Sequence, residues 1–267
     1  MLGKINEAVS YIRHKTDFKP ITGIILGSGL NTFAQEIRME KNLPYESIPN
    51  FPVATVQGHH GNLVFGYIND HPVVVMEGRF HYYEGYAMEE VIFPIRVMKL
   101  LGASRLFVTN ACGGLNPEYE VGDMMVIEDH INLMPNPLIG MHHPEFGERF
   151  PDMSDTYNKE MIEQALAVAR KENFTLHRGC YIGLTGPTLE TPAEYKYLRI
   201  IGGDVVGMST VPEIIAAHQM GMQCFAVSVI TDLGVPGKIE KTTHQDVLAA
   251  AQKAEPRLAV ILKKILT

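Results

Sequence analysis

Apolar residues follow two different spacings along the chain, and each spacing predicts a different kind of element. Short apolar runs rich in β-branched residues predict strands, and apolar residues repeated every three to four positions predict helices. Strands are predicted over 20–26, 62–67, 72–76, 105–109, 124–127, 179–184, 204–206 and 224–230. Helices are predicted from residue 31 onward, over 88–101, 159–171 and 243–266, and from helix starts at 191 and 210. This alternation predicts an α/β fold with a mixed central sheet flanked by helices, in a single domain over residues 1–267.

Several turn and cap residues mark the ends of these elements. Asn69-Asp70 tolerates turn geometry and predicts a hairpin between the second and third strands. Thr191 followed by Glu194 predicts a capping box at a helix start, and Thr210 followed by Glu213 predicts a second one. Pro94 predicts a kink within the helix over 88–101. A bend at Pro256 is expected in the last helix for the same reason.

Composition and charge narrow the class of protein. The chain has 267 residues, 46% of them hydrophobic and 20% charged, which is enough to bury a sizeable core. Its net charge of −7 argues against binding to a nucleic-acid backbone, which needs a basic surface. No stretch has the length of a membrane span and the start has no secretory pattern, so we expect a cytoplasmic protein that contacts no membrane. The three cysteines lack the spacing of a metal site, and we expect reduced thiols and no bound metal.

Donors suited to an anion occur in four separate segments. The predicted strand over 20–26 runs into Gly27-Ser28-Gly29 before a helix, which exposes backbone N–H groups to a phosphate or forms only a tight turn. The run is not a dinucleotide fingerprint, because Thr32 stands where its third glycine would fall. Arg79 and His81 follow a strand end, where alternation places both on one side. A solvated arginine and a satisfied histidine are the alternative.

The other two segments are Ser209-Thr210 and Gly58–Gly61. Capping alone explains Thr210 at a helix start but leaves the hydroxyl of Ser209 unassigned. Gly58-His59-His60-Gly61 is either a loop with surface histidines or a lid over the anion. Together the four segments describe a phosphate pocket.

Ordered motifs over essentially the whole length carry a resemblance to a known family. They are Gly-Ile-Ile-Leu-Gly-Ser-Gly-Leu at 23–30, Glu-Gly-Arg-Phe-His-Tyr-Tyr-Glu-Gly-Tyr at 77–86, Thr-Asn-Ala-Cys-Gly-Gly-Leu-Asn-Pro at 109–117, Asp-His-Ile-Asn-Leu at 129–133, Arg-Phe-Pro-Asp-Met-Ser-Asp at 149–155 and Gly-Met-Ser-Thr-Val-Pro-Glu at 207–213. The chain resembles the purine nucleoside phosphorylases of the trimeric, low-molecular-mass class, whose family also contains the methylthioadenosine phosphorylases.

The resemblance implies a role for each matching position. It implies phosphate contacts from Ser28, His59, Arg79, His81, Ser209 and the backbone N–H of Ala111. It implies ribose contacts from Tyr83, Met208 and His244, with Phe150 reaching the sugar of a neighbouring subunit. It implies a purine site made by Leu189, Glu190, Val206 and Asp232. Without the resemblance, Met208 and Phe150 read as core residues and His244 as part of a helix start.

The resemblance also implies a reaction. Phosphate attacks the anomeric carbon of a purine nucleoside, the glycosidic bond breaks, and a free base and ribose 1-phosphate or deoxyribose 1-phosphate leave. His81, Glu190 and Asp232 are the expected catalytic residues. The reaction is reversible and needs no metal or organic cofactor, because phosphate is the co-substrate. Residues 135–151 form one long segment that leads up to Phe150, the residue implied to contact a neighbouring subunit. Such a segment fits a homotrimer.

Two positions depart from the family pattern. Asp232 stands where an asparagine usually binds O6 and N7 of a 6-oxopurine, and Leu189 stands where an aromatic residue commonly stacks on the base. An ionised carboxylate only accepts hydrogen bonds, so Asp232 suits a 6-amino group or a protonated N7. We expect inosine and guanosine as substrates, because this chain has Glu190 and His244, whose equivalents the methylthioadenosine phosphorylases lack. Methylthioadenosine or adenosine phosphorolysis is the alternative, and an inactive nucleoside-binding protein is the non-enzyme alternative.

Overall fold

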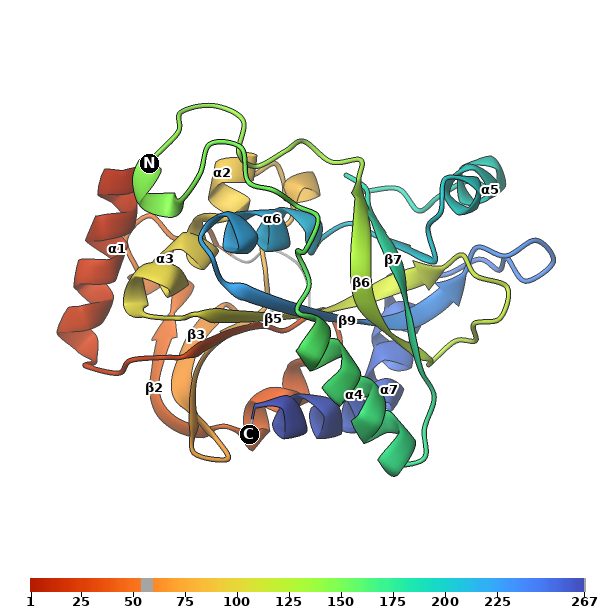
Figure 1. Cartoon of the computed structure of the whole chain (residues 1–267), viewed down its shortest axis with the longest axis horizontal. Helices are drawn as coiled ribbons and strands as arrows, with labels where there is room; N and C mark the ends of the chain where they lie inside the picture. Colours follow the sequence, from red (N-terminus) through yellow and green to blue (C-terminus); the bar gives the residue numbers. More distant parts are fainter. Residues whose placement is uncertain (54–59, 267) are drawn as a thin grey trace.

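The computed structural model describes residues 1–53 and 60–266, and within them nine strands form one mixed sheet. In the sheet the strands are ordered β2-β3-β4-β1-β5-β8-β7-β6-β9, and β5 pairs with β9 in addition (Figure 1). Their bounds are β1 Thr22–Ile25, β2 Arg38–Pro44, β3 Asn62–Ile68, β4 His71–Glu77, β5 Arg105–Gly114, β6 Met124–Asn132, β7 Leu176–Gly183, β8 Val205–Gly207 and β9 Gln223–Leu233. The predicted mixed sheet is confirmed.

Strand β5 is the centre of this arrangement. Its first half lies between β1 and β9 and is parallel to both, while its last two residues pair with β8. Because β8, β7, β6 and β9 also pair in sequence, these strands and β5 close into a ring. The strands β1, β4, β5 and β9 run in the same direction, so their carboxyl ends meet at one edge of the sheet.

Helices cover both faces of the sheet. Their bounds are α1 Leu2–Lys15, α2 Met88–Val91, α3 Phe93–Leu101, α4 Lys159–Lys171, α5 Pro192–Ile200, α6 Val211–Gln219 and α7 His244–Ile265. Helices α1, α3 and α6 pack in series on one face, and α4 and α7 pack together on the other (Figure 1). Within the described residues, no helix is long and apolar enough to cross a membrane. The main core lies between these helices and the sheet.

The hairpin and most predicted strands and helices match the structure. The helix predicted from residue 31 onward is a short 3₁₀ helix over Asn31–Glu36, and the predicted helix over 88–101 is interrupted near Pro94. The predicted helix over 88–101 is wrong as a single element, because α2 ends at Val91 and α3 begins at Phe93. Proline has no N–H to continue the hydrogen bonds of a preceding helix, but it fits the first turn of a new one. Pro94 lies in that first turn, so the chain makes a break where a kink was expected. Helix α7, by contrast, continues through Pro256.

The two predicted capping boxes have different outcomes. Thr191 accepts a 3.2 Å bond from the N–H of Glu194, and the Glu194 carboxylate accepts a 2.7 Å bond from the N–H of Thr191, which confirms the box before α5. The predicted box at Thr210 is wrong, because the Thr210 side chain makes no cap bond. Glu213 lies 3.4 Å from Arg79 instead. Glu213 therefore forms an ion pair with Arg79 and not a capping box with Thr210.

Candidate active site

A pocket of about 740 Å³, open solvent at its mouth included, lies at the edge where the parallel strands end. Strand β1 leads into Ser28, β4 leads into Arg79 and His81, and the end of β9 supplies Asp232. The pocket gathers most of the predicted residues, namely Ser28, Arg79, His81, Tyr83, Ala111, Leu189, Glu190, Val206, Met208, Ser209, Asp232 and His244.

Two predicted site residues are not in this group. His59 lies outside the described residues. Phe150 lies in another hollow, together with Ile139, and 88% of its surface is exposed. The alternative that Phe150 belongs to the core is therefore wrong for this chain. Its predicted contact with a neighbouring subunit stays a prediction.

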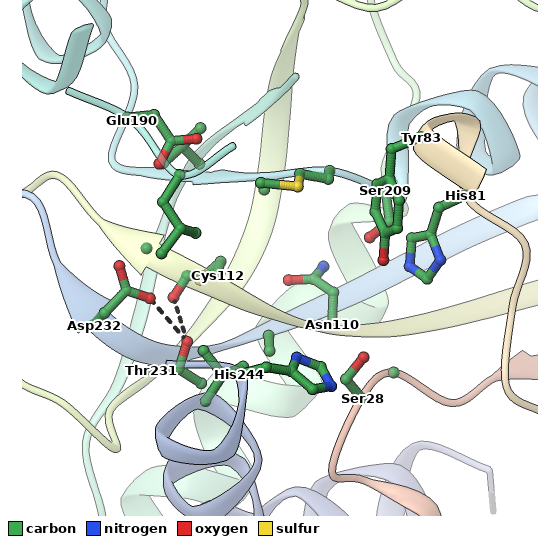
Figure 2. A pocket seen from close by; sticks show the side chains of 18 of the residues that line it. Ser28, His81, Tyr83, Asn110, Cys112, Glu190, Ser209, Thr231, Asp232 and His244 are labelled. Carbon is green, nitrogen blue, oxygen red and sulfur yellow. Dashed lines mark hydrogen bonds between the residues drawn. The ribbon is translucent and has the colours of Figure 1, made fainter. Parts of the chain in front are cut away.

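The predicted anion donors gather at one end of the pocket. Figure 2 shows Ser28, His81 and Ser209 at this end, with Glu190 and Asp232 at the opposite end. The turn that carries Ser28 requires a glycine at position 29 for two reasons. Its φ is +74°, and a Cβ there would lie 2.8 Å from Ala251 Cβ and 3.0 Å from the Leu248 carbonyl oxygen. The close approach holds the turn that carries Ser28 against α7.

Arg79 is held from beneath the pocket. Its side chain is 2% exposed. Its Nη1 donates to Thr210 Oγ1 at 3.2 Å and to Glu213 Oε1 at 3.4 Å, and its Nη2 donates to the Thr109 carbonyl. The solvated arginine considered as an alternative is therefore wrong. A buried guanidinium with fixed partners keeps its charge at one place, which suits an anion site.

The environment of His81 favours the neutral ring. Burial lowers its pKa, and Arg79 lowers it further, while the hydrogen bond to Glu84 acts in the opposite direction. Its Nδ1 lies 2.8 Å from Glu84 Oε1, which also accepts a 2.8 Å bond from the His81 backbone N–H. A carboxylate only accepts, so Nδ1 carries the ring proton and the lone pair lies on Nε2. The ring stacks on Tyr83 with centroids 4.7 Å apart.

Tyr83, Met208 and His244 also line the pocket, and Tyr83 lies beside His81 and Ser209 at its anion end (Figure 2). Met208 packs tightly against Gly186, where a Cβ would lie only 2.3 Å from its sulfur. His244 is the first residue of α7, and the preceding Thr243 closes a capping box with Asp246. The cap fixes the start of α7 and with it the position of His244.

Glu190 and Asp232 occupy the far end, and both hold protons more tightly than usual. Burial raises the pKa of Glu190, and the nearby charge of Asp232 raises it further. Burial also raises the pKa of Asp232, although hydrogen bonds from Thr231 and Tyr195 oppose that shift. Thr231 Oγ1 lies 3.1 Å from Asp232 Oδ1 (Figure 2). The Tyr195 hydroxyl lies 3.5 Å from Oδ2.

A β-bulge places Thr231 and Asp232 together. Cys112 of β5 pairs with Ile230 and Gly113 pairs with Asp232, so Thr231 is the extra residue on β9. Strand alternation would send Thr231 and Asp232 to opposite sides, whereas the bulge lets both line the pocket. The Thr231 hydroxyl also lies 3.2 Å from the Cys112 carbonyl.

Several residues of the site have no role predicted from the sequence. Asn110, Cys112 and Thr231 line the pocket, and Tyr195 touches Asp232 from α5. Asn110 and Cys112 belong to the motif at 109–117, which offered a signal. Tyr195 and Thr231 offered none, because their places depend on the helix packing and on the bulge.

Comparison with known proteins identifies the class of this fold and site. The sequence profile described as the phosphorylase superfamily matches residues 21–267, and the chain belongs to that family. It is 46% identical to purine nucleoside phosphorylase 1 of Bacillus subtilis (strain 168), an alignment that covers 99% of this chain and 98% of the relative. It is also 46% identical to the purine nucleoside phosphorylase of Rattus norvegicus, over 96% of this chain and 92% of the relative.

Solved structures agree with these sequence relatives. A Schistosoma purine nucleoside phosphorylase in complex with hypoxanthine matches with a TM-score of 0.93 and 41% identity, over 98% of this chain and 96% of that chain. The Schistosoma mansoni enzyme in complex with adenosine matches with a TM-score of 0.93 and 42% identity, over the same shares. The α/β fold and the family resemblance of the sequence are both confirmed.

Proposed function

We propose that the chain catalyses the reversible phosphorolysis of purine nucleosides, ribosides and deoxyribosides alike. The observation that carries the proposal is one pocket with cationic and hydroxyl donors at one end and two half-buried acids at the other. A nucleoside with phosphate has the matching order: an anion, a sugar and a base with polar edges. The relatives named purine nucleoside phosphorylase support the same activity.

The anion end positions the nucleophile. Arg79, Ser28, Ser209 and the N–H of Ala111 would hold phosphate beneath the sugar, so that one phosphate oxygen faces the anomeric carbon. That oxygen forms the new C–O bond while the bond from the anomeric carbon to N9 breaks and its electron pair passes to the purine. Negative phosphate close to the sugar stabilises the positive charge that develops there.

The base end receives the charge of the leaving purine. An ionised Glu190 accepts from N1–H of a 6-oxopurine, and a protonated Asp232 donates to N7, which neutralises the departing base. The raised pKa of Asp232 favours the protonated form that this step requires. We therefore propose inosine and guanosine as the preferred substrates. No cofactor enters this scheme, because protein groups and phosphate supply every charge and proton.

Adenosine or methylthioadenosine is the second candidate substrate, and Asp232 is the observation that favours it. When ionised, this carboxylate accepts from a 6-amino group, as the usual asparagine oxygen also can, but it cannot donate to O6. A structure of the Schistosoma mansoni relative holds adenosine. The inactive binding protein is disfavoured, since binding a nucleoside alone does not require a buried arginine beside the sugar.

We also propose that the chain forms a homotrimer in the cytoplasm. The segment that ends at Phe150 exposes apolar side chains, with Ile139 79% and Met141 82% exposed, and large apolar side chains on a surface often mark an interface. Cys112, Cys180 and Cys224 are free thiols, which suits a reducing compartment. Sedimentation equilibrium tests the assembly, and a mass of one chain at micromolar concentration would refute it.

Base release with and without phosphate tests the proposed reaction. Inosine, guanosine and adenosine are incubated side by side, and hypoxanthine, guanine and adenine are measured together with ribose 1-phosphate. Release that depends strictly on phosphate, with equal amounts of base and sugar phosphate, is the expected result. Release without phosphate would indicate hydrolysis, and no release from any nucleoside would refute the proposal.

A further inference from the structure

Thr210 is an unusual residue beneath the anion end of the pocket. It is fully buried, and its backbone has φ +73° and ψ −54°, a region that a β-branched residue rarely adopts. Such a conformation persists only where the surroundings enforce it, and it is often linked to function. The side chain does not cap α6, so helix capping does not account for a threonine here.

The Thr210 hydroxyl lies within hydrogen-bond distance of three polar atoms. Arg79 Nη1 is 3.2 Å from Thr210 Oγ1, Asn110 Nδ2 is 3.0 Å away, and Ser209 Oγ is 3.2 Å away. The guanidinium and the amide nitrogen can only donate. They fill both lone pairs of the hydroxyl, so its one hydrogen is directed to Ser209.

This count of hydrogens fixes the role of Ser209. Since Ser209 Oγ accepts from Thr210, its own hydrogen points elsewhere. The buried Tyr181 hydroxyl lies beside Ser209, which also lines the pocket at the anion end, where an incoming phosphate offers the stronger acceptor. A phosphate dianion mainly accepts hydrogen bonds, so a serine fixed as a donor needs no reorganisation when phosphate arrives. The same threonine also helps to hold Arg79, the buried cation of the site.

We propose that Thr210 is a positioning residue for phosphate, which fixes Ser209 as a donor and holds Arg79 in place. The inference rests on the proposed phosphorolysis and assigns to Thr210 a share of phosphate affinity that does not extend to the nucleoside. Chains of hydrogen bonds of this kind strengthen one another in a buried site. Removal of the Thr210 hydroxyl therefore weakens two phosphate contacts at once.

Thr210→Val tests the inference, because valine keeps the branched shape and removes the hydroxyl. Compared with the parent, we expect the KM for phosphate to rise about 10- to 100-fold, as charged hydrogen bonds are lost. The KM for inosine at saturating phosphate is expected to stay unchanged. Thr210→Ser restores the hydroxyl and is expected to restore the parent KM for phosphate. Thr175→Val, at an exposed site between α4 and β7, is the matched control.

The outcomes separate this inference from the proposed function. A parent protein without phosphate-dependent cleavage refutes the proposed function itself. An active parent whose Thr210→Val variant keeps its phosphate KM overturns the inference, and so does an equal rise in both KM values. If Thr210→Val does not fold, Thr210→Ala gives the same comparison without a branched side chain at positive φ. Phosphate binding measured by calorimetry on folded variants must follow the same order, with serine tight and valine or alanine weak.

Discussion

Replacement of Asp232 by asparagine tests how this chain distinguishes purines. The substitution keeps the shape of the side chain and exchanges one acceptor oxygen for an NH₂ donor. In the parent, Asp232 Oδ1 faces the Thr231 hydroxyl at 3.1 Å and Oδ2 faces the Tyr195 hydroxyl at 3.5 Å, so the carboxyl has fixed neighbours and cannot simply turn away. The change therefore acts on the base edge.

The size of the effect follows from one hydrogen bond at a half-buried position. A mismatched polar pair costs about 1–3 kcal/mol, or about 5- to 150-fold in kcat/KM, because 1.4 kcal/mol is a factor of ten. Asp232→Asn gains a donor for O6 of inosine at every pH. We expect the ratio of kcat/KM for inosine to that for adenosine to rise by this factor at alkaline pH, where the parent carboxyl is ionised.

The pH dependence gives the prediction its direction. Below the raised pKa of Asp232 the parent carboxyl is protonated and donates like the amide, so parent and variant converge. Above that pKa the parent loses its donor and the inosine preference falls, whereas the variant keeps it. Glu190 titrates at a lower pH in the variant than in the parent, because the charge of Asp232 no longer raises its pKa. Initial rates for both nucleosides at saturating phosphate, from pH 5 to 9, measure the two profiles. Equal ratios for parent and variant throughout would refute this reasoning.

Three further predictions concern stability. Because burial raises the folded-state pKa of Asp232, ionisation of this group destabilises the folded protein as pH rises through that pKa, and the destabilisation is absent below the unfolded value near 3.8. Thermal unfolding should therefore show that the stability of Asp232→Asn relative to the parent increases with pH. Glu213→Gln leaves Arg79 without its buried counter-charge and should lower the free energy of unfolding by about 3–5 kcal/mol in urea titrations; a loss below 1 kcal/mol would contradict the ion pair as a structural element. Thr191→Ala removes the cap of α5 and should cost about 1 kcal/mol by the same titration, with Thr175→Ala as the neutral control.

Much of the site could be predicted because many of its residues directly follow the ends of strands. A run of apolar residues marks each strand, and the polar residues after it fall at the carboxyl edge of the parallel strands, which is how Ser28, Arg79 and His81 could be grouped. Strand β2 escaped prediction, since it is an edge strand with mostly exposed side chains and no alternation. Helix α1 did carry a signal, with Ile5, Ala8, Val9 and Ile12 on its buried face, but it was not predicted.

Tertiary contacts explain the remaining differences. The sequence patterns at Thr191 and Thr210 are nearly the same, yet only the first forms a capping box. The glutamate of the second is 2% exposed and pairs with Arg79, which follows β4 and is far away in the sequence. No local rule contains that partner. The bulge at Thr231 is likewise a property of the pairing between β5 and β9, and neither strand shows it alone.

The central strand β5 also sets the distance between the two ends of the pocket. Figure 2 shows Asn110 nearer the anion end and Cys112 nearer the two acids, and Gly113 of the same strand pairs with Asp232. A strand rises about 3.3 Å per residue, so the three steps from Asn110 to Gly113 span about 10 Å of a hydrogen-bonded and inextensible backbone. The spacing between the two ends of the pocket is therefore a property of the paired backbone of β5 and not of any one side chain.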